Sequence, residues 1–324
     1  MIKIRCDRED DFRLLNLTDP QLKIEEWQAD NRTGKVFKKT VETLIERVSP
    51  DLITLSGDLS YAGDFASYRK FADYFDSFQI PWTCCFGNHD NQDGDEPVQK
   101  VLEEYRRHPY FVFEACDPAL GNSNFVILIE KNGKSAEGVI LMDTHDKIPY
   151  TKDECGKNLA WAGLTPQQLE WYRNRIADLE QQGCRDSTLI THIPINAYLA
   201  AAKAAFKQAE PNRSVTLADS DGTDPWNAGY EDSYGVFHEP ISAYPEDEGA
   251  WDLICELGST KHIVCGHNHI NNWVVNYHGV RFIFGTKTGI GSYFEPDLNG
   301  GTVLMINQNG VRSVHHEYVD LAKI

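Results

Sequence analysis

The stretch Leu52-Ile53-Thr54-Leu55-Ser56-Gly57-Asp58 decides the fold, because it places an acid directly after a short apolar run. Four β-prone residues that end abruptly in Gly-Asp indicate a buried strand, and open α/β folds bind ligands at the carboxyl edge of such strands. Asp58 is therefore expected at this edge. Tyr61, three residues later, can turn its phenol back toward the same point if the chain coils there. Asp also caps helices and turns, so Asp58 alone does not identify a site.

Three later stretches repeat this pattern of an apolar run that ends in Asn or His. They are Gly87-Asn88-His89-Asp90, Thr191-His192 and Gly266-His267-Asn268-His269. Asp19 ends an earlier predicted strand, because Pro20 cannot donate to a sheet ladder. Oxygen and imidazole donors in this combination suit two cations such as Fe, Mn or Zn that share one carboxylate. A lone buried His is more often a hydrogen-bonded core residue than a ligand, so the metal prediction depends on the whole series.

The segments between these stretches alternate between helical and strand patterns. Helices are predicted over residues 33–48, 65–78, 96–107, 165–182, 196–208 and 250–257. Strands are predicted over 12–18, 52–55, 81–86, 111–113, 124–130, 138–143, 188–191 and 261–265, with an antiparallel set over 273–277, 280–284, 301–306 and 311–318. Residues 209–248 are rich in acids, Gly, Pro and aromatics, and are predicted to form a substrate-facing insert.

The composition favours a single globular domain over residues 1–324. The chain has 41% hydrophobic residues and no apolar run near the roughly 18 residues of a membrane helix. Its net charge of -18 repels polyanions and membrane surfaces, so neither nucleic acid nor a membrane is expected as a partner. Eight scattered Cys residues and an N-terminus without an apolar signal region favour a cytoplasmic protein. The oligomeric state is left open.

The series Asp19, Gly57-Asp58, Gly87-Asn88-His89-Asp90, His192 and Gly266-His267-Asn268-His269 resembles the calcineurin-like metallophosphoesterase superfamily, in the same order and over about residues 12–285. The resemblance implies an α/β fold, a four-layer α/β/β/α sandwich of two mixed sheets. It also implies a first metal ion bound by Asp19, Asp58 and His269. A second ion would be bound by Asp58, Asn88, His192 and His267, with His89 as a histidine that binds no metal and lies close to the leaving group.

One position separates this chain from many members of the superfamily. They carry a His two residues after the first Asp, where this chain has Gln21. Purple acid phosphatases also lack that His and use a Tyr three residues after the bridging Asp, the spacing of Asp58 and Tyr61. A phenolate ligand at neutral pH needs a strong Lewis acid, so the resemblance implies Fe(III) in the first site, with Fe, Zn or Mn in the second. The alternatives are a Tyr61 that only packs beside the site, and a Gln21 that binds the metal weakly or hydrogen-bonds a metal-bound water.

The function implied is a metal-dependent phosphatase, in which a metal-bound hydroxide attacks a small phosphomonoester. His89 is predicted to protonate the leaving alkoxide, and Asp90 to orient its ring. Two alternatives remain: a phosphodiesterase acting on a small or cyclic diester, and a binding scaffold without catalysis.

Three weaker signals complete the sequence prediction. Residues 285–291 carry three glycines, which either cradle a phosphate or mark a turn. His145 and His238 are candidate substrate contacts, although surface histidines are commoner.

Overall fold

A computed structural model of the chain describes residues 1–92, 95–149, 159–205 and 233–324. The helices are α1 (Arg32–Val48), α2 (Phe65–Asp76), α3 (Asp95–Tyr105), α4 (Pro166–Gln181), α5 (Ala197–Ala205) and α6 (Ala250–Leu257). The strands are β1 (Ile2–Cys6), β2 (Phe12–Leu17), β3 (Leu52–Ser56), β4 (Trp82–Cys85), β5 (Phe125–Lys131), β6 (Lys134–Leu141), β7 (Lys147–Pro149), β8 (Leu159–Trp161), β9 (Ser187–Ile190), β10 (Tyr234–Phe237), β11 (Thr260–Cys265), β12 (Asn271–Tyr277), β13 (Val280–Phe284), β14 (Gly300–Asn307) and β15 (Gly310–Tyr318).

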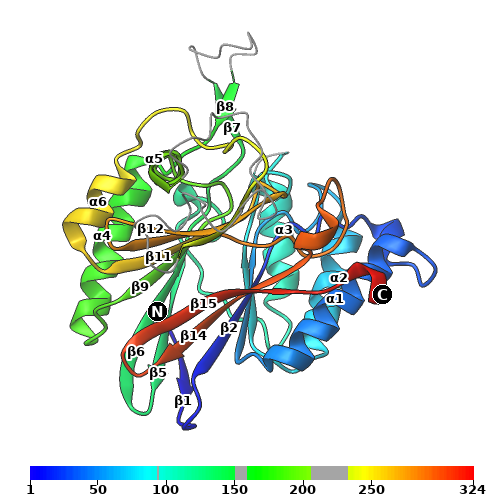
Figure 1. Cartoon of the computed structure of the whole chain (residues 1–324), viewed down its shortest axis with the longest axis horizontal. Coiled ribbons are helices and arrows are strands. Elements are labelled where there is room, and N and C mark those ends of the chain that lie inside the picture. Colours follow the sequence, from blue (N-terminus) through cyan, green and yellow to red (C-terminus); the bar gives the residue numbers. More distant parts are fainter. Residues whose placement is uncertain (93–94, 150–158, 206–232) are drawn as a thin grey trace, which may run out of the picture.

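The strands form two main sheets that pack face to face. An eight-stranded sheet has the order β1-β5-β6-β9-β11-β13-β12-β10, and a five-stranded sheet has the order β15-β14-β2-β3-β4. Both sheets mix parallel and antiparallel pairs. Helices α1, α2 and α3 cover the smaller sheet, and α4, α5 and α6 cover the larger one (Figure 1). This arrangement confirms the predicted four-layer α/β/β/α sandwich of two mixed sheets.

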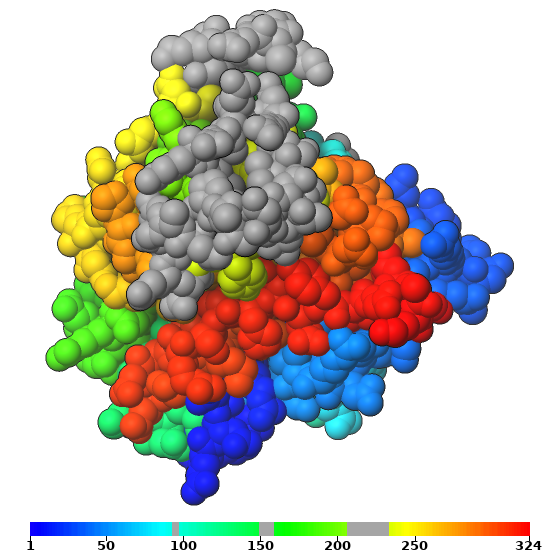
Figure 2. Space-filling model, viewed as in Figure 1, coloured from blue at the N-terminus to red at the C-terminus, as the bar shows by residue number. Residues whose placement is uncertain are grey.

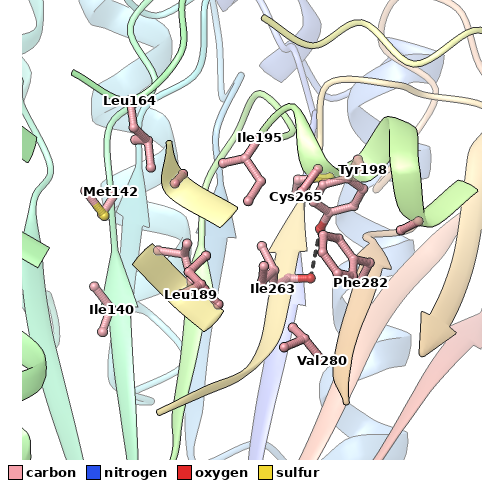
Figure 3. Packing of buried hydrophobic residues seen from close by; sticks show 14 of the residues in the cluster. Ile140, Met142, Leu164, Leu189, Ile195, Tyr198, Ile263, Cys265, Val280 and Phe282 are labelled. Carbon is pink, nitrogen blue, oxygen red and sulfur yellow. Dashed lines mark hydrogen bonds between the residues drawn. The ribbon is translucent and has the colours of Figure 1, made fainter. Parts of the chain in front are cut away.

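The apolar runs in the sequence are continuous because both faces of each sheet are buried. Leu14 faces the opposite sheet, whereas its neighbour Leu15 packs in the cluster beneath the helices. The outer face of the larger sheet shows the same packing in Figure 3, where Tyr198 of α5 lies beside Ile263 and Phe282. The hydroxyl of Tyr198 donates a hydrogen bond to the carbonyl oxygen of Ile263 at 2.8 Å.

Parallel pairing brings the carboxyl ends of five strands to one edge of the sandwich. β2 and β3 are parallel with Leu17 opposite Leu55, so Asp19 and Asp58 leave the sheet side by side. β4 continues this parallel set on the far side of β3. In the other sheet, β9 and β11 are parallel. The loops that follow these five strands carry every predicted metal ligand, with Asp58 and Tyr61 in the same loop after β3.

The C-terminal end of the chain belongs to the same sandwich as its beginning. β14 pairs with β2 and β15, and Figure 2 shows this red C-terminal hairpin crossing one face of the molecule. Over the part of the chain that the structure describes, no helix combines the length and the apolar character needed to cross a membrane.

Several predicted elements differ from the structure. Residues 111–113 do not form a strand: Phe111 makes one isolated bridge to Trp82. The described part of the predicted insert at 209–248 contains a strand that was not predicted, β10, which pairs with β12 and is an edge strand of the larger sheet; that the insert faces substrate stays a prediction. The remainder of that insert, residues 209–232, lies outside the described residues. No strand was predicted over residues 2–6 because charged and apolar residues alternate there, but these residues form the edge strand β1, which pairs with β5.

Glu137 lies on β6, on the same face as Val139 and Leu141, and points between the two sheets. It is fully buried, and its Oε1 accepts a hydrogen bond from the hydroxyl of Thr188 at 2.8 Å. Burial raises the pKa of Glu137 to about 8, the bond from Thr188 opposes the shift, and the nearby charge of Asp186 adds to it. The folded chain therefore holds a proton on Glu137 that the unfolded chain releases.

We expect Glu137→Gln to stabilise the protein at pH 8 and to have little effect at pH 4. The unfolded pKa is about 4.3, so the wild type loses stability as pH rises from there to about 8, after which the loss is constant. The gain at pH 8 should be a few kcal/mol. Denaturant unfolding at several pH values measures it, with the variant Glu46→Gln, at an exposed position of α1, as the control. A gain that does not change with pH would contradict this account.

Candidate metal centre

Three of the predicted ligands meet at one buried point where the edges of the two sheets come together. Asp19, Asp58 and His269 each offer one ligand atom, and these atoms all lie within 4.8 Å of one another. Nε2 of His269 lies 3.3 Å from Oδ1 of Asp19. All three side chains are almost completely buried. The structure thus gathers the set expected for the first metal ion.

The remaining predicted ligands form a second group that also contacts Asp58. Nε2 of His192 lies 3.1 Å from Oδ1 of Asn88 and 3.3 Å from Oδ1 of Asp58. The ring of His267 packs edge-on against that of His192, with centroids 5.2 Å apart. Asp58 is therefore close to members of both groups, as a shared carboxylate must be, and Nε2 of His192 also lies 4.0 Å from Oδ1 of Asp19.

Backbone carbonyls orient two of the imidazoles. Nδ1 of His192 lies 2.8 Å from the carbonyl oxygen of Ser56, and Nδ1 of His269 lies 2.9 Å from that of Tyr293. A carbonyl oxygen only accepts, so Nδ1 carries the proton in each ring. Each Nε2 is thereby aimed at the carboxylates, and a cation bound there would take the place of a proton on that nitrogen.

Unpaired polar atoms at this point fit bound cations. Oδ1 of Asp19, Oε1 of Gln21 and Nε2 of His267 are buried and make no hydrogen bond within the described residues. Burying such atoms without a partner costs free energy, and a coordinated cation removes that cost. Carboxylate, amide and imidazole donors suit Fe, Mn and Zn.

The charges of the site are strongly coupled. Burial would lower the pKa of His192, but the carboxylates of Asp58 and Asp19 outweigh it and raise that pKa to about 10. Burial lowers the pKa of His267 to about 3, and His192 adds to the shift. His267 is therefore neutral, the state in which an imidazole binds a metal.

The glycines of the motifs allow the loops to approach one another closely. A Cβ on Gly87 would lie 2.2 Å from Oδ1 of Asp58, and one on Gly266 would lie 2.0 Å from the hydroxyl oxygen of Thr18. Several non-glycine residues here have left-handed backbone angles, with φ of 54° at Asp19, 53° at Asp58 and 72° at His267. Such strain is typical of functional sites, where the surrounding structure holds it in place.

His89 lies at the exposed side of the centre. Its Nε2 is 3.9 Å from Oδ2 of Asp58, and its backbone amide donates to Oδ1 of the same residue at 2.8 Å. Gln92 holds the ring, with its Nε2 at 2.8 Å from Nδ1 of His89. His89 therefore reaches the edge of the centre without joining the groups described above.

The prediction that Asp90 orients His89 is not what the structure shows. The carboxylate of Asp90 points away into the fold, where it accepts hydrogen bonds from the hydroxyl of Tyr68 at 2.6 Å and from the amide of Gly87 at 2.8 Å. It also accepts from the amides of Leu59 and Ser60. Asp90 therefore links the loop after β3 to the loop after β4, because these unpaired amides need an acceptor.

Tyr61 and Gln21 also lie at the centre. The ring of Tyr61 packs edge-on against His89, with centroids 5.0 Å apart. Gln21 donates from Nε2 to Oδ2 of Asp58 at 3.0 Å, so it contacts the shared carboxylate directly. Ligation of iron by Tyr61 stays a prediction.

The glycine-rich segment 285–291, together with Ser292 and Tyr293, supports the first site. Lys287 is buried and donates from Nζ to the carbonyl oxygen of Asp19, while the carbonyl of Tyr293 accepts from His269. A Cβ on Gly291 would lie 2.3 Å from the carbonyl oxygen of Pro20, so this segment packs tightly on the loop that carries Asp19. Sequence reasoning missed Lys287, although a Lys between Gly-Thr and Thr-Gly directly after an apolar strand was a usable signal.

The two candidate substrate contacts lie in different surroundings. The amide of His145 donates to Oδ1 of Asp143 at 2.8 Å, and Asp143 also binds Asn91 in the loop after β4. Nδ1 of His238 lies 4.0 Å from Oε2 of Glu295. Contact of either histidine with substrate stays a prediction.

Comparison with known proteins identifies related sequences. The sequence model of the calcineurin-like phosphoesterases matches residues 12–271. The chain is 24% identical over 290 residues to "Probable inactive purple acid phosphatase 14" of Arabidopsis thaliana, covering 82% of this chain and 64% of that protein. A shorter stretch of 74 residues is 36% identical to a "Probable cyclic nucleotide phosphodiesterase" of Synechococcus, covering 23% of this chain and 27% of that protein. The chain thus spans less than two thirds of the length of these relatives.

A solved structure supports the same architecture. A dimetal phosphatase from Danio rerio superposes with a TM-score of 0.54 at 12% identity, covering 96% of this chain and all of that one. At this identity the similarity concerns the fold alone, which is the sandwich of two sheets described above.

Proposed function

Because this chain belongs to the calcineurin-like phosphoesterase family, we propose that it hydrolyses a small phosphomonoester at two metal ions. One observation carries the proposal: five oxygen or imidazole donors from four loops gather around a single buried carboxylate, that of Asp58, which comes from a fifth loop. The first ion would be held by Asp19, Asp58 and His269, and the second by Asp58, Asn88, His192 and His267.

A pair of ions in this site would supply a nucleophilic water at neutral pH and neutralise the charge of the phosphoryl group. Residues of the chain position the ligands and supply the proton for the leaving group. Asp58 fixes the distance between the two groups of ligands, and Gln21 keeps its carboxylate oriented through the 3.0 Å hydrogen bond. The side-chain amide of Gln92 contacts His89 at Nδ1, which leaves the Nε2–H of the protonated ring to act as the donor. From there the proton can pass to the oxygen of the leaving group.

The word "inactive" in the name of a relative makes catalysis the point to test. In favour of activity, each ligand position of this chain carries a donor side chain, and the structure brings them together. The test is a panel of small phosphate esters with protein reconstituted in Fe, Mn or Zn. Turnover that Asp58→Asn abolishes supports the proposal. Protein that retains two ions and hydrolyses none of the esters would instead support the non-catalytic scaffold.

A phosphodiesterase is the second candidate function. The stretch shared with a protein named as a cyclic nucleotide phosphodiesterase favours it. The same nucleophile can attack either ester, so only the walls of the pocket discriminate between them. Rates with an aryl phosphate monoester and its matched diester rank the two: faster monoester hydrolysis supports a phosphatase.

We also propose Fe(III) in the first site, with Fe, Zn or Mn in the second. The support is the position of Tyr61, three residues after Asp58 and beside His89. We expect aerobically purified protein to show a broad visible absorption band from tyrosinate bound to iron, and Tyr61→Phe to lose that band. The control is Tyr74→Phe, a tyrosine of α2 whose ring packs against Phe37 of α1. A colourless protein that contains iron would overturn the assignment.

A further inference from the structure

Three aromatic side chains form a rim around the metal centre, and each packs against one of its histidines. The ring of Tyr61 lies 5.0 Å from that of His89, and the ring of Trp161 lies 4.4 Å from that of His267, both edge-on. The ring of Tyr293 lies 4.1 Å from that of His269 and is stacked, at 17° to it. These three residues, Tyr61, Trp161 and Tyr293, come from three separate loops or strands and are called the aromatic rim below.

Two rings of the aromatic rim carry a lysine on one face. Nζ of Lys23 lies 5.1 Å from the centroid of Tyr61, and Nζ of Lys147 lies 4.5 Å from that of Trp161. Each ammonium group is attracted by the π-electrons of the ring beneath it. The lysines place positive charge beside the centre of a chain with a net charge of -18, which favours the approach of an anionic ester.

Tyr293 differs from the other two rings. In the described parts of the chain, no ammonium or guanidinium group lies over its ring, and the residue is 48% exposed. Its hydroxyl donates to Oε2 of Glu239 at 2.9 Å, and Oε1 of Glu239 accepts from the amide of Ile270 at 2.9 Å. The ring is therefore fixed at both ends, by His269 and by Glu239, while its outer face remains exposed.

A rigid, half-exposed aromatic ring beside a metal ligand is suited to stack a planar group. Little conformational freedom is lost when a ligand binds to a ring that is already held. Stacking of this kind contributes about 1–3 kcal/mol per base in single-stranded nucleic acid binding.

We propose that Tyr293 is the platform for the leaving group, and that the preferred substrates are phosphate esters of planar aromatic or heteroaromatic alcohols. This inference deepens the proposed function and depends on it for hydrolysis. In this arrangement the phosphate lies at the two ions and the ring of the leaving group stacks on Tyr293. Lys23 and Lys147 attract the negatively charged phosphate group.

Binding of two phosphonates to metal-loaded protein tests the platform without turnover. Phenylphosphonate and methylphosphonate share the charged group and differ only in the planar ring. We expect the wild type to bind phenylphosphonate more tightly in calorimetry. Tyr293→Leu should weaken phenylphosphonate binding about tenfold, and its affinity for methylphosphonate should stay within about twofold of the wild-type value. Tyr293→Phe, which keeps the ring, should retain the preference, and so should Tyr318→Leu, an exposed tyrosine outside the rim.

Three results would overturn the inference. Wild-type protein that binds the two phosphonates equally has no platform. A Tyr293→Leu variant that binds both phosphonates more weakly by the same factor, or that has lost metal in elemental analysis, shows that Tyr293 acts only by holding His269. Hydrolysis of phenyl phosphate and glycerol phosphate is measured separately. Wild-type protein that lacks the phosphonate preference but hydrolyses both esters refutes the platform alone, whereas wild-type protein with a clear preference that hydrolyses neither ester refutes only the proposed function.

Discussion

Asp58→Asn is expected to remove both metal ions and to slow ester hydrolysis by about 10³-fold or more. The carboxylate of Asp58 belongs to the cluster with Asp19 and His269, and its Oδ1 lies 3.3 Å from Nε2 of His192 in the second ligand group. Asn keeps the volume of the side chain but removes the charge and one of the two oxygens. Neither group then has its shared ligand.

Elemental analysis after dialysis, together with the rate on an aryl phosphate, measures this effect. The control is Asp51→Asn, at the opposite end of the same strand, where Asp51 pairs with Arg8. That variant should keep both ions and full activity. An Asp58→Asn protein that still binds two ions with wild-type affinity would show that Asp58 does not bridge them.

His89→Ala is expected to slow turnover by about two to four orders of magnitude while leaving the metal content unchanged. His89 lies at the edge of the centre, with Nε2 at 3.9 Å from Asp58, and its backbone amide, which the substitution keeps, makes the closer contact. Only the proton donor for the leaving group is therefore removed. The loss should be smaller for esters whose leaving groups need no proton.

Rates with aryl phosphates of graded leaving-group pKa, combined with metal analysis, test this role. Gln92→Ala is the companion variant: it frees the ring of His89 and should slow turnover less than His89→Ala does. His108→Ala, a histidine next to Asp76 outside the centre, should be neutral. If His89→Ala emptied the site, His89 would be a metal ligand and its assignment as proton donor would be wrong.

The sequence predicted the centre because each ligand follows a strand directly. Gly57-Asp58, Asn88 and the pair His267 and His269 come within four residues of a strand end, so the parallel order of the strands was enough to bring them together. The glycines in these motifs have a steric explanation that the sequence does not contain. Gly87 and Gly266 lie where another loop comes too close for a Cβ.

Contacts between distant segments could not be predicted in this way. Asp90 was assigned to its neighbour His89, but its partners are Tyr68 and the amides of two loops, which only the packing of α2 against the sheet brings near. Lys287 and Tyr293 reach Asp19 and His269 across more than 20 residues of intervening sequence. β10 is an edge strand inside a segment with a polar composition, so its short apolar pattern did not predict a strand.

The central claim is that side chains from five loops bind a pair of ions around Asp58. Anomalous diffraction from crystals grown with Mn²⁺ tests it most directly. The account predicts two anomalous peaks about 3.5–4 Å apart, on either side of the carboxylate of Asp58. One of them should lie next to Nε2 of His269 and the other next to Nε2 of His192. Crystals grown in excess Mn²⁺ that show no anomalous peak near Asp58, or that show peaks only elsewhere in the fold, would contradict the claim.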